Sequence, residues 1–194
     1  SEFAGKASAA GVDVLLFSED VLHGCTIVRE AVAQALPADA PECRQVGALA
    51  RRHGLALLVG FIERDGDLRY NSHLIAGADG SLAVQRKYAL NGKELANGLA
   101  RGSAERVPFT VKGRRCHIAI CADWGAKAVQ DDLDRQRCEV VFLPTAGGGT
   151  REQMLHAASL AAEEGIAAYA ERMRRVAFPF EMIGYCLRNR RAVV

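Results

Sequence analysis

Three polar residues that can take part in chemistry each come at the end of a short apolar run of the kind that forms a buried strand. They are Glu19 after residues 12–17, Lys87 after residues 82–85, and Cys121 after residues 117–120. Residues at the carboxyl ends of strands often line a common crevice, so side chains that are distant in sequence can meet there. A cysteine in such a place can act as a nucleophile.

Each of the three residues also has a structural interpretation. Most free cysteines are small buried apolar residues, so Cys121 can simply belong to the core. An acid in the position of Glu19 is about as likely to be an exposed residue in the first turn of a helix. A lysine such as Lys87 at a strand end is usually a solvated charge. The local sequence leaves both interpretations open.

Strand-like and helix-like patterns alternate along the chain. Strands are expected at 12–17, 55–62, 68–76, 82–85, 107–111, 115–120, 140–143 and from 191, and helices before 11 and at 25–36, 41–53, 126–137 and 150–176. The run at 12–17 has the pattern of a strand covered on both faces. The pair 68–76 and 82–85 is expected to be antiparallel, and residues 89–103 form a long polar loop. This order indicates an α/β protein with mixed sheets, or a layered α-β-β-α architecture.

Composition excludes several classes of function. The chain has 194 residues, 49% apolar and 25% charged, with a net charge of +2, which is typical of a single globular domain and gives no case for nucleic-acid binding. Its apolar runs are too short to cross a membrane. The six cysteines form no Cys-x-x-Cys pair, so we expect no metal site, reduced thiols and a cytoplasmic protein.

Three segments, in this order, resemble the nitrilase superfamily of carbon–nitrogen hydrolases. Val14 to Glu19 resembles the strand that leads to the family's catalytic glutamate. Gln85 to Leu90 resembles the segment with its catalytic lysine, and Ile118 to Asp123 resembles the Ile-Cys-x-Asp segment with its nucleophile. The apolar run 140–144 also matches, so the resemblance spans roughly residues 5–146.

The resemblance implies a four-layer α-β-β-α sandwich and a Glu-Lys-Cys triad without metal or cofactor. Cys121 would be the nucleophile, Glu19 the general acid and base, and Lys87 with the backbone N–H of Ala122 the stabilisers of the oxyanion. Lys87 would also favour the thiolate. Glu94 resembles the family's second, supporting glutamate. Trp124 could line the substrate pocket, or could pack in the core.

The chain also departs from the family pattern. Ser18 stands where the family usually has proline. We interpret Ser1–Phe3 as a cloning remnant and residues 1–194 as a single domain that is shortened at both ends, because the family has a strand and a full helix before the glutamate and further strands after the point where Val194 ends this chain. The sandwich is therefore expected to be incomplete.

The expected activity is hydrolysis of a non-peptide C–N bond through a thioester, in an amide rather than a nitrile. The partners expected are a small amide or nitrile substrate and further copies of the chain in a homodimer or higher homo-oligomer, with neither nucleic acid nor membrane. Three alternatives remain open: an acyltransferase of the same fold, a catalytically inactive interaction module, and a glutaminase module that serves a synthetase.

Overall fold

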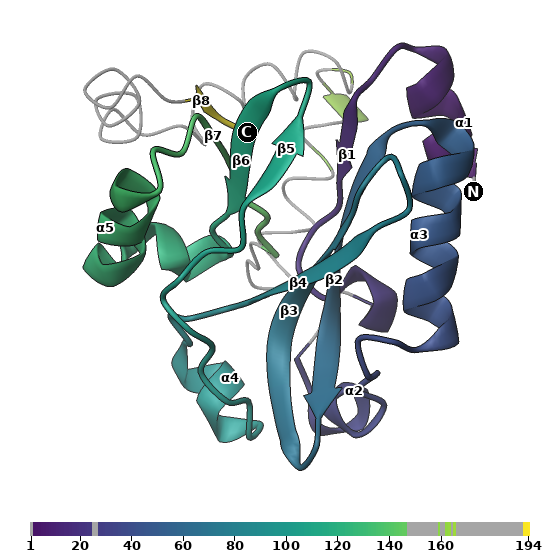
Figure 1. Cartoon of the computed structure of the whole chain (residues 1–194). Coiled ribbons are helices and arrows are strands. Elements are labelled where there is room, and N and C mark those ends of the chain that lie inside the picture. Colours follow the sequence, from purple (N-terminus) through teal and green to yellow (C-terminus); the bar gives the residue numbers. More distant parts are fainter. Residues whose placement is uncertain (1, 25–26, 147–158, 160–161, 164, 166–191) are drawn as a thin grey trace. The chain divides into compact units, whose positions relative to one another are not determined.

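The computed structural model describes residues 2–24, 27–146, 159, 162–163, 165 and 192–194 (Figure 1). The chain divides into two units, Ser1–Ala146 with Ala192–Val194, and Gly147–Arg191. Both sheets and all candidate site residues belong to the first unit. The helix expected at 150–176 falls almost wholly outside the described residues, of which 159 and 162–163 are helical.

The first sheet has four strands in the order β1-β2-β3-β4. The strands are β1 (Val14–Leu16), β2 (Ala56–Asp65), β3 (Leu68–Ala76) and β4 (Leu82–Arg86). β1 pairs parallel to β2, with Val14 opposite Ala56, and the other pairs are antiparallel. The antiparallel pair expected from the sequence is thus confirmed. β1 is shorter than expected and only half-buried, because it lies at the edge of the sheet and pairs on one side.

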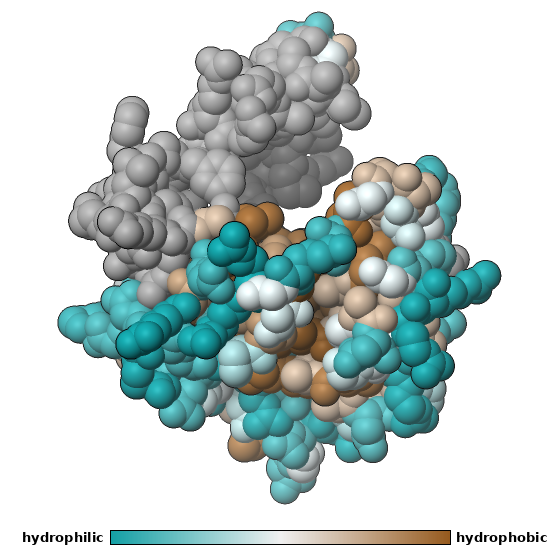
Figure 2. Space-filling model, turned by 45° about the horizontal axis from the view of Figure 1, so that its top comes forward, coloured by the Kyte–Doolittle hydropathy of each residue, from teal (hydrophilic) through white to brown (hydrophobic). Residues whose placement is uncertain are grey.

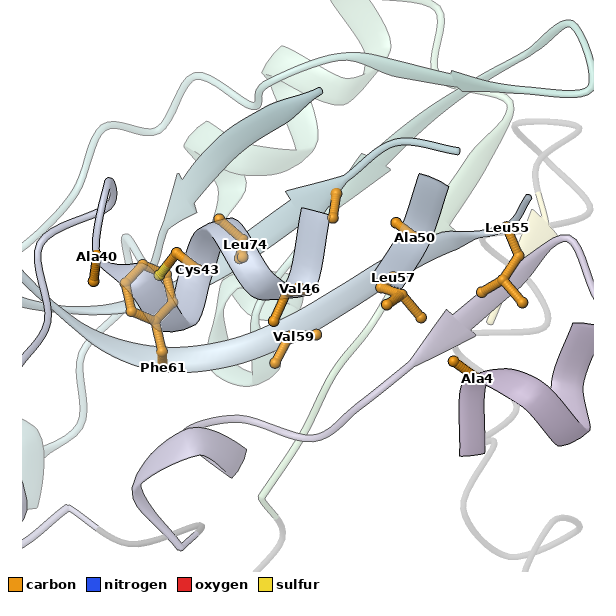
Figure 3. Packing of buried hydrophobic residues seen from close by; sticks show 11 residues of the cluster. Ala4, Ala40, Cys43, Val46, Ala50, Leu55, Leu57, Val59, Phe61 and Leu74 are labelled. Carbon is orange, nitrogen blue, oxygen red and sulfur yellow. The ribbon is translucent and has the colours of Figure 1, made fainter. Parts of the chain in front are cut away.

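Two helices, α1 (Glu2–Ala9) and α3 (Pro41–His53), pack against the first sheet (Figure 1). The sequence sets both ends of α3, because Pro41 fits the first helical turn and Gly54 adopts the left-handed conformation that ends it. Figure 3 shows Cys43, Val46 and Ala50 of α3 in one cluster with apolar residues of β2. This cluster fixes the strands that lead to the candidate site.

The second sheet has the order β5-β6-β7-β8. Its strands are β5 (Phe109–Val111), β6 (Arg114–Ile118), β7 (Val140–Phe142) and β8 (Ala192–Val193). β5 and β6 are antiparallel, while β6, β7 and β8 are parallel. The helix α5 (Lys127–Arg135) buries Val129 and Leu133 in one cluster with Ala119 and Val141. The protein is therefore α/β with two mixed sheets.

A further cluster joins residues of the two sheets. Leu58 and Ile75 come from the first sheet, and Ile118 and Phe142 come from the second, with Ile120 directly after β6. These buried side chains remove apolar surface of both sheets from water at once, which is the main favourable contribution to folding. The ends of β1, β4 and β6 are thereby held within one packed unit.

Some elements differ from the pattern in the sequence. The helix α2 covers only Arg29–Ala33, because Leu36 leaves the helical path and forms a parallel bridge with Glu63 of β2. The expected loop at 89–103 contains a short helix, α4 (Gly92–Ala96). Two 3₁₀ helices, η1 (Val21–His23) and η2 (Cys121–Gly125), follow β1 and β6. None of the helices in the described ranges is long and apolar enough to cross a bilayer.

A hollow of about 640 Å³ opens beside Asp13, which precedes β1, and Phe109 of β5. On the face of the molecule shown in Figure 2, hydrophobic residues gather at a hollow and hydrophilic residues surround them. Glu19, Lys87 and Cys121 do not line the hollow. Because Asp13 and Glu19 lie beyond opposite ends of β1, the candidate site is elsewhere.

Candidate active site

Glu19 lies in a turn that rests directly on β2. A Cβ atom at Gly60 would be 2.4 Å from the Ser18 oxygen and 2.5 Å from the Asp20 nitrogen, so the turn can lie here only because residue 60 has no side chain. Glu19 comes three residues after the end of β1 rather than at the strand end itself. Its side chain is buried, with 4% of the residue exposed.

The Glu19 carboxylate accepts hydrogen bonds on both oxygens. Oε2 accepts from Lys87 Nζ at 2.8 Å and from Asn71 Nδ2 at 2.9 Å, and Oε1 accepts from the Ala146 N–H at 2.8 Å. Burial by itself would raise the pKa of Glu19, but Lys87, the Ala146 N–H and Asn71 hold that pKa below its ordinary value. Glu19 is therefore ionised at neutral pH, as a proton acceptor must be.

Lys87 follows β4 directly, and its main chain is held on both sides. Its N–H donates to the Asn71 oxygen at 2.8 Å, and its own oxygen accepts from Gly102 at 2.8 Å. A Cβ at Gly102 would be 2.5 Å from the Arg86 Cβ, so a glycine is required here too. Lys87 is 1% exposed, which rules out the solvated strand-end charge considered for it.

The Lys87 ammonium is shared between two carboxylates. Nζ donates to Glu19 Oε2 and to Glu94 Oε1, each at 2.8 Å. Burial would lower the pKa of Lys87, but Glu19 and Glu94 outweigh burial and raise it. Lys87 is thus a permanent cation that can stabilise negative charge but cannot serve as a base near neutral pH.

Glu94 connects the site to the helix α4. Its Oε1 contacts Lys87, while Oε2 accepts from the Asn91 N–H at 2.7 Å. In return, Asn91 Oδ1 accepts from the Glu94 N–H at 3.0 Å, which completes a capping box. The structure therefore brings Glu94 to Lys87, where the resemblance placed a supporting glutamate, and the capping box explains its position.

Asn71 of β3 is a site residue that sequence reasoning missed. Its Nδ2 donates to Glu19 Oε2 at 2.9 Å and to Glu94 Oε1 at 2.8 Å. It thus ties together the two carboxylates that hold Lys87. The available signal was a fully polar amide within an otherwise strand-like run, but a polar residue in such a run more often faces water.

Cys121 begins η2 rather than ending β6 directly, and its main chain has a φ of 48°. Its N–H donates to the Pro144 oxygen at 2.9 Å. The thiol lies close enough to Glu19 and to the Ala122 N–H for both to act on its pKa. The structure therefore brings the three groups together, because Glu19 acts on the thiol and is hydrogen-bonded to Lys87.

The Cys121 thiol is protonated in this arrangement. Burial and the negative charge of Glu19 raise the pKa of Cys121 to about 11, although Lys87 and the Ala122 N–H lower it. Lys87 by itself lowers the pKa of the thiol, as expected. The site as a whole raises that pKa and so favours the protonated thiol. A nucleophilic thiolate can form here only if Glu19 takes the proton as the sulfur attacks.

Asp20 places one more carboxyl group beside this cluster. Its Oδ1 is buried and has no hydrogen-bond partner among the described residues. Burial and the charge of Glu19 raise the pKa of Asp20 to about 7, although the Lys87 cation lowers it, and Glu94 has a smaller effect that raises it. Lys87 already faces the carboxylates of Glu19 and Glu94, so an ionised Asp20 would be a third negative charge beside a single cation.

Trp124 is half-buried and packs against a core cluster that includes Val129 and Leu133 of α5. This position fits the packing alternative stated for it. Among the residues that the structure describes, no three His, Cys, Asp or Glu side chains form a group that could hold a metal ion.

The family model described as carbon-nitrogen hydrolase matches residues 1–175. The chain belongs to this family. The resemblance inferred from three short segments is thus confirmed. The half-buried Cys121 thiol and the buried Glu19 and Lys87 side chains all lie within the matched range.

Curated relatives of this chain include a nitrilase and a second protein named only as a hydrolase. It is 30% identical over 95 residues to the bromoxynil-specific nitrilase of Klebsiella pneumoniae subsp. ozaenae, which is 42% of this chain and 27% of that protein. It is 31% identical over 143 residues to a protein of Pseudomonas protegens named "Hydrolase in pqqF 5'region", which is 71% of this chain and 50% of that protein. The chain thus spans half or less of these relatives' length.

The fold of this carbon-nitrogen hydrolase is similar to that of solved amidases. A mutant amidase from Nesterenkonia sp. AN1, in which acrylamide has added to the active-site cysteine, superposes with a TM-score of 0.65 at 23% identity. The match covers 79% of this chain and 61% of the amidase. At this level of identity the likeness concerns the fold.

Proposed function

We propose that this protein cleaves the C–N bond of a small non-peptide compound, an amide rather than a nitrile, through a thioester on Cys121. The observation that carries the proposal is that Glu19 acts on the Cys121 thiol at close range while Glu19 Oε2 lies 2.8 Å from Lys87 Nζ. The three groups are the nucleophile, the proton acceptor and the cation that such a reaction needs.

In the first half of the reaction, Glu19 takes the thiol proton while the Cys121 sulfur bonds to the carbonyl carbon. The electron pair of the C=O bond moves to oxygen, and the Lys87 ammonium with the Ala122 N–H stabilises the negative charge there. Removal of one such donor typically costs about 3–4 kcal/mol of transition-state stabilisation. When the C–N bond breaks, Glu19 returns its proton to the departing ammonia or amine, which leaves a thioester on Cys121.

In the second half, Glu19 takes a proton from water as the water oxygen attacks the thioester carbon. Collapse of the tetrahedral intermediate breaks the C–S bond and releases the carboxylic acid. The proton on Glu19 returns to the sulfur, so the site is restored. The same carboxylate thus serves as base and acid in turn, which requires a carboxylate that is ionised in the resting site, as Glu19 is.

The finer architecture is part of the same proposal. α1 and α3 share a cluster with the first sheet, α5 shares one with the second sheet, and a third cluster contains residues of both sheets. These three clusters support a layered α-β-β-α sandwich of the kind expected from the resemblance.

The test is turnover of a panel of small primary amides and nitriles, read as released ammonia. Cys121→Ala and Cys121→Ser should reduce turnover to background, because both remove the thiolate nucleophile. Cys138→Ala is the matched control, since Cys138 is buried among core residues near α5. Turnover by Cys121→Ala at the rate of the wild type would reject the mechanism.

A second readout does not depend on knowing the substrate. Acrylamide should add to Cys121, as it does to the active-site cysteine of the Nesterenkonia amidase mutant, and intact mass and peptide mapping would locate the adduct. Failure to label Cys121 in folded protein would favour an inactive interaction module. Product that forms only when an amine is added would identify acyl transfer instead of hydrolysis.

A further inference from the structure

Asp123, the acid of the Ile-Cys-x-Asp segment, has no part in the proposed proton transfers, yet it is fully buried. Its carboxylate accepts four hydrogen bonds: on Oδ1 from the N–H groups of Tyr88 at 2.9 Å and Ala89 at 2.7 Å, and on Oδ2 from Ile120 N–H at 3.1 Å and Arg106 at 2.9 Å. A carboxylate offers about four lone-pair positions, so all are in use.

Three of the four donors to Asp123 lie on the two segments that carry the reacting groups. Tyr88 and Ala89 are the first two residues after Lys87, and Ile120 directly precedes Cys121. Three of the four bonds come from main-chain N–H groups, so they hold the path of the chain rather than side-chain rotamers. One rigid group therefore fixes the Lys87 segment relative to the Cys121 turn.

Arg106 supplies the opposite charge. Its guanidinium and the Asp123 carboxylate form an ion pair in which both side chains are fully buried. Arg106 also donates from Nε to the Ala104 oxygen at 3.0 Å and from its other terminal nitrogen to the Ser103 oxygen. A buried carboxylate without such a partner would be strongly unfavourable. Arg106 thus allows Asp123 to remain a charged acceptor in the interior.

The main chain at Cys121 needs such support. Its φ of 48° lies in the left-handed region, which costs a residue with a Cβ atom on the order of 1 kcal/mol or more. The turn is held by the Asp123 N–H, which donates to the Ile120 oxygen at 3.0 Å, and by the Asp123 carboxylate, which accepts from the Ile120 N–H. Asp123 therefore forms hydrogen bonds with both the N–H and the oxygen of Ile120, the residue immediately before the nucleophile.

We propose that Asp123, with Arg106 as its counter-ion, is a positioning residue that keeps Cys121 and Lys87 in register for the reaction. The proposal rests on the proposed function, because it assigns Asp123 no chemistry of its own. Asparagine cannot replace it, since the amide group presents N–H groups to two of the four donors.

The direct test is Asp123→Asn in the full chain. We expect folded Asp123→Asn to lose about 10- to 100-fold in kcat with little change in KM, because small displacements of reacting groups cost that much. We also expect the pH profile of Cys121 alkylation by acrylamide to shift, because the thiol moves relative to Glu19 and Lys87. Wild-type kcat and an unchanged profile in a folded variant would overturn the proposal.

The matched control is Asp132→Asn. The Asp132 carboxylate accepts from the Arg106 N–H at 2.7 Å, and none of its described hydrogen bonds reaches residues 88, 89 or 120. Asp132→Asn should lower the melting temperature, because it changes an acid beside Arg106. Its kcat and its alkylation profile should not change. Equal losses of kcat in both variants would count against a specific role of Asp123.

If Asp123→Asn does not fold, hydrogen exchange of the wild-type protein tests whether Asp123 holds the two segments. The amides of Tyr88, Ala89 and Ile120 should exchange at least about 100-fold more slowly than unprotected amides, as is also expected for strand amides of β2. Exchange at unprotected rates would overturn the proposal. Exchange and alkylation report on Asp123 even if no amide is hydrolysed, so failure of the proposed function and failure of the positioning role remain distinguishable.

Discussion

Lys87 Nζ lies 2.8 Å from Glu19 Oε2 and the same distance from Glu94 Oε1, with all three side chains buried. A single cation therefore compensates two carboxylates in the interior. A buried charge whose partner is removed is far more costly than an exposed one. This relationship makes Lys87 a structural requirement of the site, in addition to the chemical role proposed for it.

Lys87→Met should therefore both abolish turnover and destabilise the fold. We expect a loss of about 3–5 kcal/mol in the free energy of unfolding, because Glu19 and Glu94 would lose their cation. Chemical denaturation measures this loss. Lys127→Met is the control, because Lys127 and Asp131 form an exposed pair and such pairs contribute about 0–1 kcal/mol. Equal effects of the two substitutions would contradict the compensation.

Glu19→Gln should separate the reactivity of the thiol from turnover. The charge of Glu19 helps to raise the pKa of Cys121 to about 11, whereas Lys87 lowers it. Without the negative charge, the midpoint of the pH profile for alkylation of Cys121 by iodoacetamide should fall below that of the wild type. Turnover should nevertheless be lost, because no group remains to carry the proton. A higher midpoint in Glu19→Gln would show that Glu19 stabilises the thiolate.

Asp20 should make the stability of the protein depend on pH. Its pKa is about 7 in the folded state, above the value of about 4 for an exposed aspartate. Between these values the folded state holds a proton that the unfolded state has released, so stability falls as pH rises from about 4 to about 7. Asp20→Asn should remove this loss, which amounts to a few kcal/mol at about 1.4 kcal/mol per pKa unit.

The measurement for Asp20 is urea denaturation of both proteins across this pH range. The free energy of unfolding of Asp20→Asn should increase relative to that of the wild type as pH rises. Asp79→Asn is the control with the opposite sign, because Ser81 lowers the pKa of the exposed Asp79 and its ionised form is the favoured one. A difference between Asp20→Asn and the wild type that stays constant with pH would contradict a raised pKa.

Gly60→Ala should disturb the site without changing any reacting group. The added Cβ would meet main-chain atoms of Ser18, Glu19 and Asp20 at 2.4–2.8 Å, and main chain cannot yield as a side chain can. We expect a loss of about 3 kcal/mol, at the upper end of overpacking effects, together with lower turnover. Gly92→Ala, where nothing lies within 4 Å, should leave stability within about 0.5 kcal/mol.

Elements with local signals could be predicted from the sequence. α3 spans Pro41–His53 as expected, because a proline opens it and a glycine ends it. β3 spans Leu68–Ala76 as expected, since alternation and flanking turns mark it. The sequence predicts a loop where the structure has α4, although Asn91 and Glu94 have the spacing of a capping box, because a five-residue helix is too short to show a periodic pattern.

Tertiary contacts could not be read in the same way. Asn71, Asp20 and Arg106 gain their roles from partners on other elements, and nothing in their immediate neighbours marks them. A buried arginine such as Arg106 is unusual, so composition rules assign it to the surface. The net effect of the site on the Cys121 thiol likewise depends on burial and on Glu19 together, which motif spacing does not contain.

The capping box of α4 has a consequence for how the site comes apart. One oxygen of Glu94 closes the first turn of that helix, and the other lies on the Lys87 ammonium. Because both oxygens belong to one planar group, unwinding residues 92–96 withdraws an acceptor from the lysine in the same motion. Fraying of α4 and loss of the Glu94 acceptor from the Lys87 ammonium are therefore coupled in this protein.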